Sequence, residues 1–505
     1  MSWPVASRRR LLGGLAAGSL LGSTALGSSA HAQAARGRSR TKPPDRRCII
    51  DAGWALLHSD AGLGLQRDVS IVVTDDRIED VKHRPFRSSL PRVDARDQLV
   101  LPGFISGHTH VAGGTVTRGI FEGRRSYARA LEIAETLDDP ALDALTALNL
   151  AELLRSGCTT QLDMALSLRQ MKSYVRVAQR WGVRAYPSAM IPGIERLFAI
   201  WQRKDDEVLR ASVPQTLDEI AAALDYARSI NGAGEGRILP QMAMHASDTH
   251  TPETVRAMLA AARELGNGLH LHLCQSAKEV ETVERLWQKR PVQWLESLGV
   301  FSQRVFGAHM SGSDPLLDAP ILKSASFTYC TCPSAGGASG FTQPWPEMLA
   351  AGVNTNIGID THSNDYVENL KLAVLKGEAR WSLIRKTSAA PMRRPTIQDA
   401  LEAATLGAAR GLGRDDIGRI AVGAKADLIS IDVSGLLAGA GALPPEPQYH
   451  LLYANGLMVR HVMIDGVFKV FDGTLRVGDE VELLEEGGAV VRKLWSQLAS
   501  EGYFK

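Results

Sequence analysis

The stretch Leu101-Pro102-Gly103-Phe104-Ile105-Ser106-Gly107-His108-Thr109-His110 decides how this chain is interpreted. It is typical of a buried strand, because its residues are apolar or small until two histidines close it. Side chains two positions apart on a strand point the same way, so His108 and His110 share one face. Two neutral imidazoles that converge at a strand end are able to bind a divalent metal such as zinc. Such a pair alone is equally compatible with histidines that hydrogen-bond to the backbone.

Three later segments have a similar form, each a short, mostly apolar run with a histidine or an aspartate at or next to its end. They are residues 268–273, 305–309 and 353–360. Amphipathic stretches of helical length lie between them. Strands that alternate with helices predict parallel β/α units, and polar groups at the ends of successive strands predict a closed barrel with its active site on that face. We therefore predict an α/β protein with a (β/α)8 barrel.

At this point the chain resembles a known family. The opening stretch is similar to the "PGF…HTH" signature of the amidohydrolase superfamily, and residues 270–273, 307–309 and 358–360 are similar to its fifth, sixth and eighth strands. The branch resembled holds triazine hydrolases, cytosine-type deaminases and adenosine-analogue deaminases. The resemblance covers about residues 47 to 475. It implies a metal-dependent hydrolase with a small β-sandwich domain formed from both chain ends.

The predicted organisation follows from these segments. We expect a twin-arginine signal peptide at residues 1–32, a linker at 33–47, the first part of the β-sandwich at 48–102, the barrel at 103–413, the second part of the sandwich at 414–475 and a helical tail at 476–505.

The N-terminus has the pattern of an export signal. Ser7-Arg8-Arg9-Arg10-Leu11-Leu12 precedes a run rich in Gly and Ala, and Ala30-His31-Ala32 is a small-x-small cleavage site. This pattern predicts the twin-arginine route, with cleavage near Gln33. Glycines interrupt the run, so we expect no stable membrane anchor after cleavage. The expected location is periplasmic or secreted.

Composition narrows the class of partner. The chain has 505 residues and a formal net charge of +2, which favours a small-molecule substrate over a nucleic acid. Whether it forms a homo-oligomer is open. Its five cysteines are an odd number at irregular spacing and form no disulfide framework. Cys330 or Cys332 is an alternative metal ligand, which we disfavour because histidines and an aspartate already complete a site.

The resemblance assigns the metal ligands. It implies one divalent ion, zinc first and iron, cobalt or manganese as alternatives, held by His108, His110, His272 and Asp360 with a position left for water. His272 is preferred to His270 because it lies nearer the end of its strand. His270 is then expected in the core or beside a ligand.

Two catalytic roles and one metal count follow from the same resemblance. Asp360 would accept a proton from the attacking water, and His309 would polarise the substrate or hold the hydroxide. Relatives with two metals bridge them with a modified lysine or a glutamate. Lys172 and Lys204 are the only lysines between His110 and His272, and both lie in polar, helix-like surroundings. A single metal is therefore favoured.

Substrate contacts are predicted at His245, Gln275 and His309. His245 matches a substrate histidine of the branch, with a buried structural histidine as the alternative. Deaminases of the branch carry a glutamate three residues after the fifth-strand histidine, where this chain has Gln275. An amide side chain does not shuttle protons. His362 and Asn364 either line the pocket or cap the following helix.

These observations predict a metal-dependent hydrolase of carbon–nitrogen bonds other than peptide bonds, with an amide, carbamate or urea as substrate. The alternative is a heterocycle aminohydrolase in which another group replaces the proton donor lost at Gln275. A second alternative is a scaffold that binds ligands without turnover. The five metal-site and catalytic residues, His108, His110, His272, His309 and Asp360, argue against that scaffold.

Overall fold

The computed structural model describes residues 42–60, 62–120, 122–123, 125–202 and 206–504. The predicted signal peptide, most of the predicted linker and Lys204 lie outside the described residues. The elements of the structure belong to residues 43–505, which form one unit. Among the described helices, none combines the length and the apolar character needed to cross a membrane.

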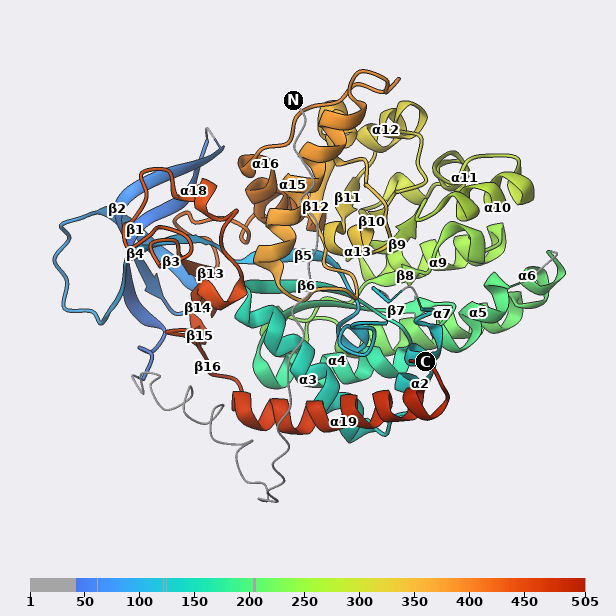
Figure 1. Cartoon of the computed structure of the whole chain (residues 1–505), viewed down its shortest axis with the longest axis horizontal. Helices are drawn as coiled ribbons and strands as arrows, with labels where there is room; N and C mark the ends of the chain where they lie inside the picture. The colour runs from blue at the N-terminus through green and yellow to red at the C-terminus, as the bar shows by residue number, and fades with distance from the viewer. Residues whose placement is uncertain (1–41, 61, 121, 124, 203–205, 505) are drawn as a thin grey trace, which may run out of the picture. The chain divides into compact units, whose positions relative to one another are not determined.

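Eight parallel strands follow one another in chain order around a barrel (Figure 1). They are β5 (Phe104–Thr109), β6 (Cys158–Ala165), β7 (Arg184–Ile191), β8 (Met242–Met244), β9 (Leu269–Leu273), β10 (Val305–His309), β11 (Phe327–Thr331) and β12 (Asn354–Ile357). The ring closes where Thr109 pairs with Asp360 in parallel and where the Asn356 amide donates to the Ile105 carbonyl at 2.9 Å. The predicted (β/α)8 barrel is confirmed.

Helices follow the strands and cover the outside of the barrel (Figure 1). The helices up to β9 are α2 (Ala128–Glu135), α3 (Asp139–Arg155), α4 (Leu168–Trp181), α5 (Ile194–Trp201), α6 (Glu207–Ala211), α7 (Val213–Ile230), α8 (Ala233–Gly236) and α9 (Pro252–Leu265). The later ones are α10 (Ala277–Trp287), α11 (Pro291–Ser297), α12 (Pro315–Ser324), α13 (Pro333–Ala338), α14 (Trp345–Ala351), α15 (Tyr366–Ile384), α16 (Ile397–Glu402), α17 (Ala408–Leu412), α18 (Pro447–His450) and α19 (Glu480–Ser500).

Local sequence explains where these helices begin and end. In α9 the Thr251 hydroxyl accepts the Thr254 N–H while the Thr254 hydroxyl accepts the Thr251 N–H, which satisfies two amides that the first turn leaves unpaired. The same helix ends at Gly266, whose φ of 71° is left-handed. Helix α4 begins after Ser167, whose hydroxyl accepts the Gln170 N–H, and it ends at Gly182, which is also left-handed.

A second sheet combines strands from both ends of the chain. Its order is β16-β15-β14-β13-β4-β1-β2-β3. These strands are β1 (Arg47–Ser59), β2 (Gly62–Thr74), β3 (Arg77–His83), β4 (Arg92–Pro102), β13 (Leu428–Asp432), β14 (Val459–Ile464), β15 (Val467–Phe471) and β16 (Thr474–Leu475). The pairing of Leu101 with Ile429 joins the two ends. The predicted second β domain from both chain ends is confirmed, and its strands form one continuous mixed sheet.

Gly103 connects the two sheets. It stands between β4 and β5, and a Cβ at this position would lie 2.2 Å from the Thr159 hydroxyl oxygen. Only glycine fits so close an approach. The chain therefore passes directly from the second sheet into the first strand of the barrel.

A buried ion-pair network fastens the second sheet to the barrel. Arg184, at the start of β7, donates to Asp427 at 2.9 and 3.2 Å and to Asp465 at 2.5 Å. All three side chains are buried. A buried ion pair of this kind adds little net stability over an apolar pair, but removing one partner leaves an uncompensated charge.

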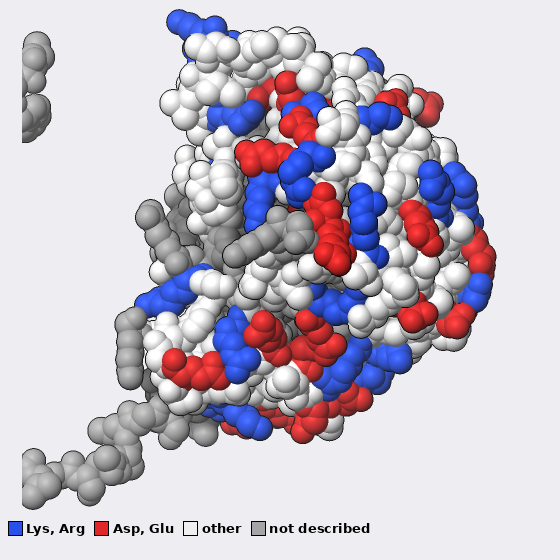
Figure 2. Space-filling view, turned by 90° about the vertical axis from the view of Figure 1, so that its right-hand side faces the viewer, with Lys and Arg blue, Asp and Glu red and all other residues white. Residues whose placement is uncertain are grey.

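Charged side chains on the face shown in Figure 2 are mixed in sign. Lys and Arg lie among Asp and Glu across that face, without a large area of one charge.

We predict that Arg184→Met destabilises the protein by about 3–5 kcal/mol, because the buried carboxylates of Asp427 and Asp465 lose their shared partner. Denaturant unfolding, followed by circular dichroism, measures the change in the free energy of unfolding. The control is Arg228→Met, which breaks an exposed pair with Glu264 and should leave the unfolding midpoint near that of the wild type. Equal midpoints for the two variants would contradict the role given to the network.

Candidate active site

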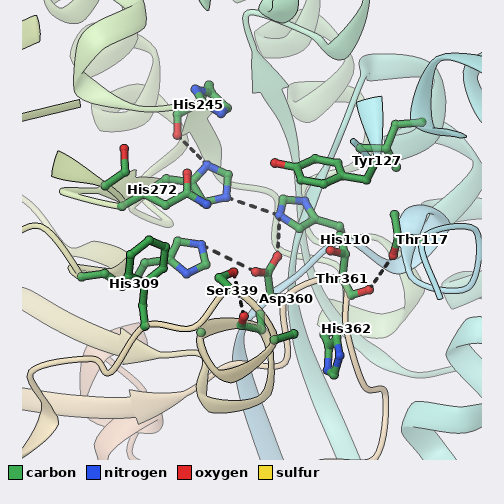
Figure 3. Close-up of a pocket in the computed structure, with 18 of the residues that line it drawn as sticks. His110, Thr117, Tyr127, His245, His272, His309, Ser339, Asp360, Thr361 and His362 are labelled. Atoms are coloured by element: carbon green, nitrogen blue, oxygen red, sulfur yellow. Dashed lines mark hydrogen bonds and ion pairs between the residues drawn. The ribbon is translucent and has the colours of Figure 1, made fainter. Parts of the chain in front are cut away.

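The predicted site residues come together at the C-terminal ends of the barrel strands (Figure 3). His108 lies in β5, His110 directly after it, His272 in β9, His309 at the end of β10 and Asp360 after β12. His309 and Asp360 have positive φ values of 79° and 61°. Such conformations are uncommon for residues other than glycine and cluster at functional sites.

The carboxylate of Asp360 lies among three imidazoles. Its Oδ1 is 3.4 Å from the Nε2 of His110 and 3.8 Å from the Nε2 of His108. Its Oδ2 is 3.8 Å from the Nε2 of His309. The Nε2 atoms of His110 and His272 are 3.3 Å apart. The two oxygens of this carboxylate therefore face different rings: Oδ1 faces His110 and His108, and Oδ2 faces His309.

Hydrogen bonds on the far side of each ring fix its orientation. The Nδ1–H of His110 donates to the Met164 carbonyl at 2.5 Å, and the Nδ1–H of His272 donates to the His245 carbonyl at 2.7 Å. In both rings the Nε2 atom then carries the lone pair that a metal needs. The Nδ1 of His108 lies 2.9 Å from the Nε2 of His270, which places His270 directly behind that ring.

The donor set fits a divalent cation. Ligand atoms of His108, His110 and His272 all lie within 4.8 Å of one another. Burial lowers the pKa of His108, His272 and His309, which keeps these rings neutral as ligation requires. Within the described part of the chain, the Nε2 atoms of His108 and His309 are buried without a hydrogen-bond partner. Nitrogen and carboxylate donors in this arrangement are those of a catalytic zinc-like site.

The charges at the centre are coupled. Burial raises the pKa of Asp360, but the hydrogen bond with His110 and the nearby His309 lower it, and the net shift is downward. Burial lowers the pKa of His110, but Asp360 reverses this and the net shift is upward. Asp360 and His110 therefore shift each other's pKa in opposite directions, and the shift of Asp360 favours its ionised form.

A cavity of about 830 Å³ opens above these residues. One wall is apolar and comes from α2, β7, α5 and the loop after β6; its residues are Leu131, Leu166, Met190, Ile194, Leu197, Phe198 and Trp201. His245 lines the cavity, with its ring 4.6 Å from that of Trp201. A volume of this size suits a small organic molecule with an apolar or aromatic part.

The remaining predicted residues divide into those at the cavity and those away from it. His362 lines the cavity and pairs with Glu122 at 2.5 Å. Asn364 is buried and donates to Asn149 and Glu152 instead. Lys172 lies on α4 with its ammonium 5.4 Å from the ring centre of Tyr226, so it makes a cation–π contact outside the site.

Gln275 is half-buried and lines the cavity. Its backbone N–H donates to the Glu279 carboxylate at 2.7 Å, and the Ser247 hydroxyl donates to the same carboxylate at 2.5 Å. Burial, with Asp248 nearby, raises the pKa of Glu279 to about 7. Glu279 therefore fixes the turn that presents Gln275, a role that sequence reasoning missed.

Asp163 supports the first two histidines and was also missed. Its Oδ1 accepts the N–H of Val111 at 2.7 Å and the hydroxyl of Thr109 at 3.2 Å. Burial raises its pKa to about 7. The signal in the sequence is a single acid inside β6, a strand that is buried throughout. A buried acid in a barrel strand indicates a fixed hydrogen-bonding task.

We predict that Asp163→Ala lowers metal affinity by about 10–100-fold, because residues that support ligands usually have effects of that size. Asp163→Asn keeps an acceptor oxygen and should stay close to the wild type. Competition with a chromogenic chelator measures both affinities. Wild-type affinity in the alanine variant would show that Asp163 does not position the histidines.

Comparisons with known proteins agree with this geometry. The amidohydrolase family model matches residues 99–469. A 5'-deoxyadenosine deaminase from Methanosarcina mazei is 28% identical over 90% of this chain and 99% of its own length. A 5-methylthioadenosine/S-adenosylhomocysteine deaminase from Moorella thermoacetica is 30% identical over 77% of this chain and 86% of its own length.

Solved structures share the fold. An adenosine deaminase from Xanthomonas campestris with bound zinc has a TM-score of 0.72 at 23% identity and covers 90% of this chain and 100% of its own. An atrazine chlorohydrolase from Arthrobacter aurescens complexed with zinc has a TM-score of 0.73 at 18% identity, with 88% and 100% covered.

The fold and the cluster of histidines with Asp360 define a barrel hydrolase with a candidate metal site. The chain belongs to the amidohydrolase family. The prediction of an amidohydrolase enzyme is confirmed, and hydrolysis of carbon–nitrogen bonds is supported.

Proposed function

We propose that this enzyme is an aminohydrolase that removes an exocyclic amino group from a heterocyclic substrate. The observation that carries the proposal is the convergence of His110, His272 and Asp360 at one cavity, with the buried His108 at 3.8 Å from the Asp360 carboxylate. Relatives named as deaminases, at 28–30% identity, support this alternative more strongly than our first prediction of an amide, carbamate or urea.

One divalent ion would be held by His108, His110, His272 and Asp360. When bound, such an ion lowers the pKa of a water molecule toward neutrality. Zinc is the first choice because its usual ligands are imidazole nitrogens and carboxylate oxygens.

Asp360 and His309 would divide the proton transfers. Asp360 is ionised and faces the site with both oxygens, so it would accept a proton from the attacking water and return it to the leaving amine. His309 is neutral and has a free Nε2 in the site, so it would orient the substrate or the water. The apolar wall would bind the substrate ring and exclude water.

Gln275 favours a second candidate, hydrolysis of an acyclic amide, carbamate or urea. Ring deamination needs a proton on the ring nitrogen as water adds, and an amide side chain does not supply one. A carbonyl substrate needs no such proton. For the aminohydrolase, the donor would be another group in the cavity, of which the neutral Tyr127 hydroxyl is a candidate.

We predict that wild-type protein releases ammonia from aminated heterocycles and that Asp360→Asn loses at least about 10²–10⁴-fold in kcat, because it removes a positioned proton acceptor. The measurement is coupled ammonia detection over a panel that includes adenosine analogues, amides, carbamates and ureas. The matched control is Asp365→Asn, where asparagine still caps α15 and activity should persist. Release from amides, carbamates or ureas alone would favour the second candidate.

We predict that Gln275→Glu raises kcat/KM for an aminated heterocycle, by up to about 10²–10⁴-fold, because it restores a titratable acid beside the site. Gln343→Glu is the control, since it puts a carboxylate elsewhere in the same cavity. If kcat/KM for the heterocycle rises in both variants, the added negative charge acts generally and not through the position of Gln275. If Gln275→Glu instead impairs an activity on amides and gives none on heterocycles, the aminohydrolase proposal fails.

A further inference from the structure

A row of aromatic rings lies along one wall of the cavity and begins at a predicted metal ligand. The ring centre of His272 is 5.1 Å from that of His245 (Figure 3), which is 4.6 Å from that of Trp201. The ring centre of Trp201 is in turn 6.1 Å from that of Phe198. All four residues line the cavity, and each neighbouring pair of rings is edge-on or tilted. We call this row the aromatic track.

Exposure rises along the aromatic track. His272 and His245 are buried, whereas Trp201 and Phe198 are half-buried. The last two residues lie three positions apart on α5, so they share one face of that helix. The track therefore runs from the predicted metal site towards the part of the cavity that solvent reaches.

The wall that carries the aromatic track is preformed. Leu131, Met190 and Leu197 line the cavity, and each is buried in an apolar cluster that extends to α2 and α19. Side chains packed into a core keep their arrangement, so this wall has a fixed shape. Its aliphatic side chains offer no hydrogen bond, and a polar group placed against them would lose its contacts with water.

Charged groups at the cavity are few. Among the described residues that line it, Asp360 is the only carboxylate and Arg125 the only lysine or arginine. Asp360 belongs to the predicted metal site, and the Arg125 guanidinium lies 5.7 Å from the ring centre of Phe504. The described lining therefore offers no second carboxylate to accept the hydroxyls of a sugar and no pair of cations to hold a phosphate.

The cavity is larger than a bare heterocycle needs. Its volume of about 830 Å³ lies within the range of about 300–1,000 Å³ that is usual for pockets that bind drug-sized molecules. Residues 335–340 also line it, and all of them are glycine, alanine or serine, which take up little of the space. The cavity therefore has room for an arm attached to the ring that reacts.

We propose that the substrate is an aminated heterocycle with an uncharged aromatic or branched aliphatic arm, which binds along the aromatic track at Trp201 and Phe198. The inference rests on the proposed aminohydrolase function and names the substrate class of that site. The heterocycle lies at the metal site, and the arm packs against the two rings, as aromatic groups do in offset or edge-on pairs. A sugar in the same place is disfavoured, because its hydroxyls would be buried without partners.

Matched pairs of compounds test the arm on wild-type protein. We compare 9-benzyladenine with adenosine and 1-benzylcytosine with cytidine, so that only the arm differs within a pair. Ammonia release gives kcat/KM for compounds that react, and calorimetry gives the affinity for those that do not. In at least one pair we expect the benzyl compound to be preferred by at least about tenfold, since even one methylene in an apolar pocket is worth about 10–200-fold.

Variants of the two aromatic residues test where the arm binds. Trp201→Ala and Phe198→Ala should each lose about tenfold or more on the benzyl compound and change little on the sugar compound. Trp201→Phe keeps a ring and should retain most of the preference. The control is Trp381→Ala, because Trp381 is also half-buried but contacts Arg385 and does not line the cavity.

Three outcomes overturn the proposed arm. In wild type, sugar compounds that match or exceed both benzyl compounds exclude it, and release of ammonia from them leaves the aminohydrolase proposal intact. Wild-type protein that binds none of the four compounds excludes it as well. A benzyl preference that survives in both alanine variants places the arm away from the aromatic track. By contrast, a benzyl preference in binding without ammonia from any compound supports the arm and contradicts the aminohydrolase proposal.

Discussion

The structure depends on the backbone hydrogen bonds that close the barrel at His108. The N–H groups of Ile359 and Asp360 both donate to the His108 carbonyl, at 3.0 and 3.1 Å. The same contact joins the last strand to the first and brings Asp360 to the histidines. A Cβ on Gly358 would lie 2.8 Å from the Cβ of His108, so glycine at this point allows the approach. Barrel closure and assembly of the site are therefore one event.

Much of the fold could be predicted because the signals are local. The alternation in β5 places His108 and His110 on one face, and Gly103 marks the passage from one sheet to the next. The supports of the site were harder to predict. Asp163 and Glu279 act on neighbours that come from other strands and turns, and only tertiary packing reveals that each is buried. Cys332 also comes near His108 only through the fold, because β5 and β11 are far apart in the sequence.

In the cavity, the names of the relatives and the residue at position 275 favour different chemistry. The relatives named above are deaminases by name, while Gln275 presents an amide where the resemblance to the deaminase branch implies an acid. Its turn is held firmly by Glu279, so the amide has a fixed place and its own hydrogen bonds to offer. An amide donates and accepts at once, which an ionised carboxylate does not. Such a group recognises a substrate edge that carries both an acceptor and a donor.

The pairing of β4 with β13 has a consequence for synthesis of the chain. Until the ribosome has made β13, one edge of β4 has no partner, and the strands already made expose unpaired backbone groups. Exposed edges of this kind favour association between chains. Because β13 lies beyond all eight barrel strands, the sheet is completed only after the barrel has been translated. We therefore expect nascent chains to need protection from aggregation through most of translation.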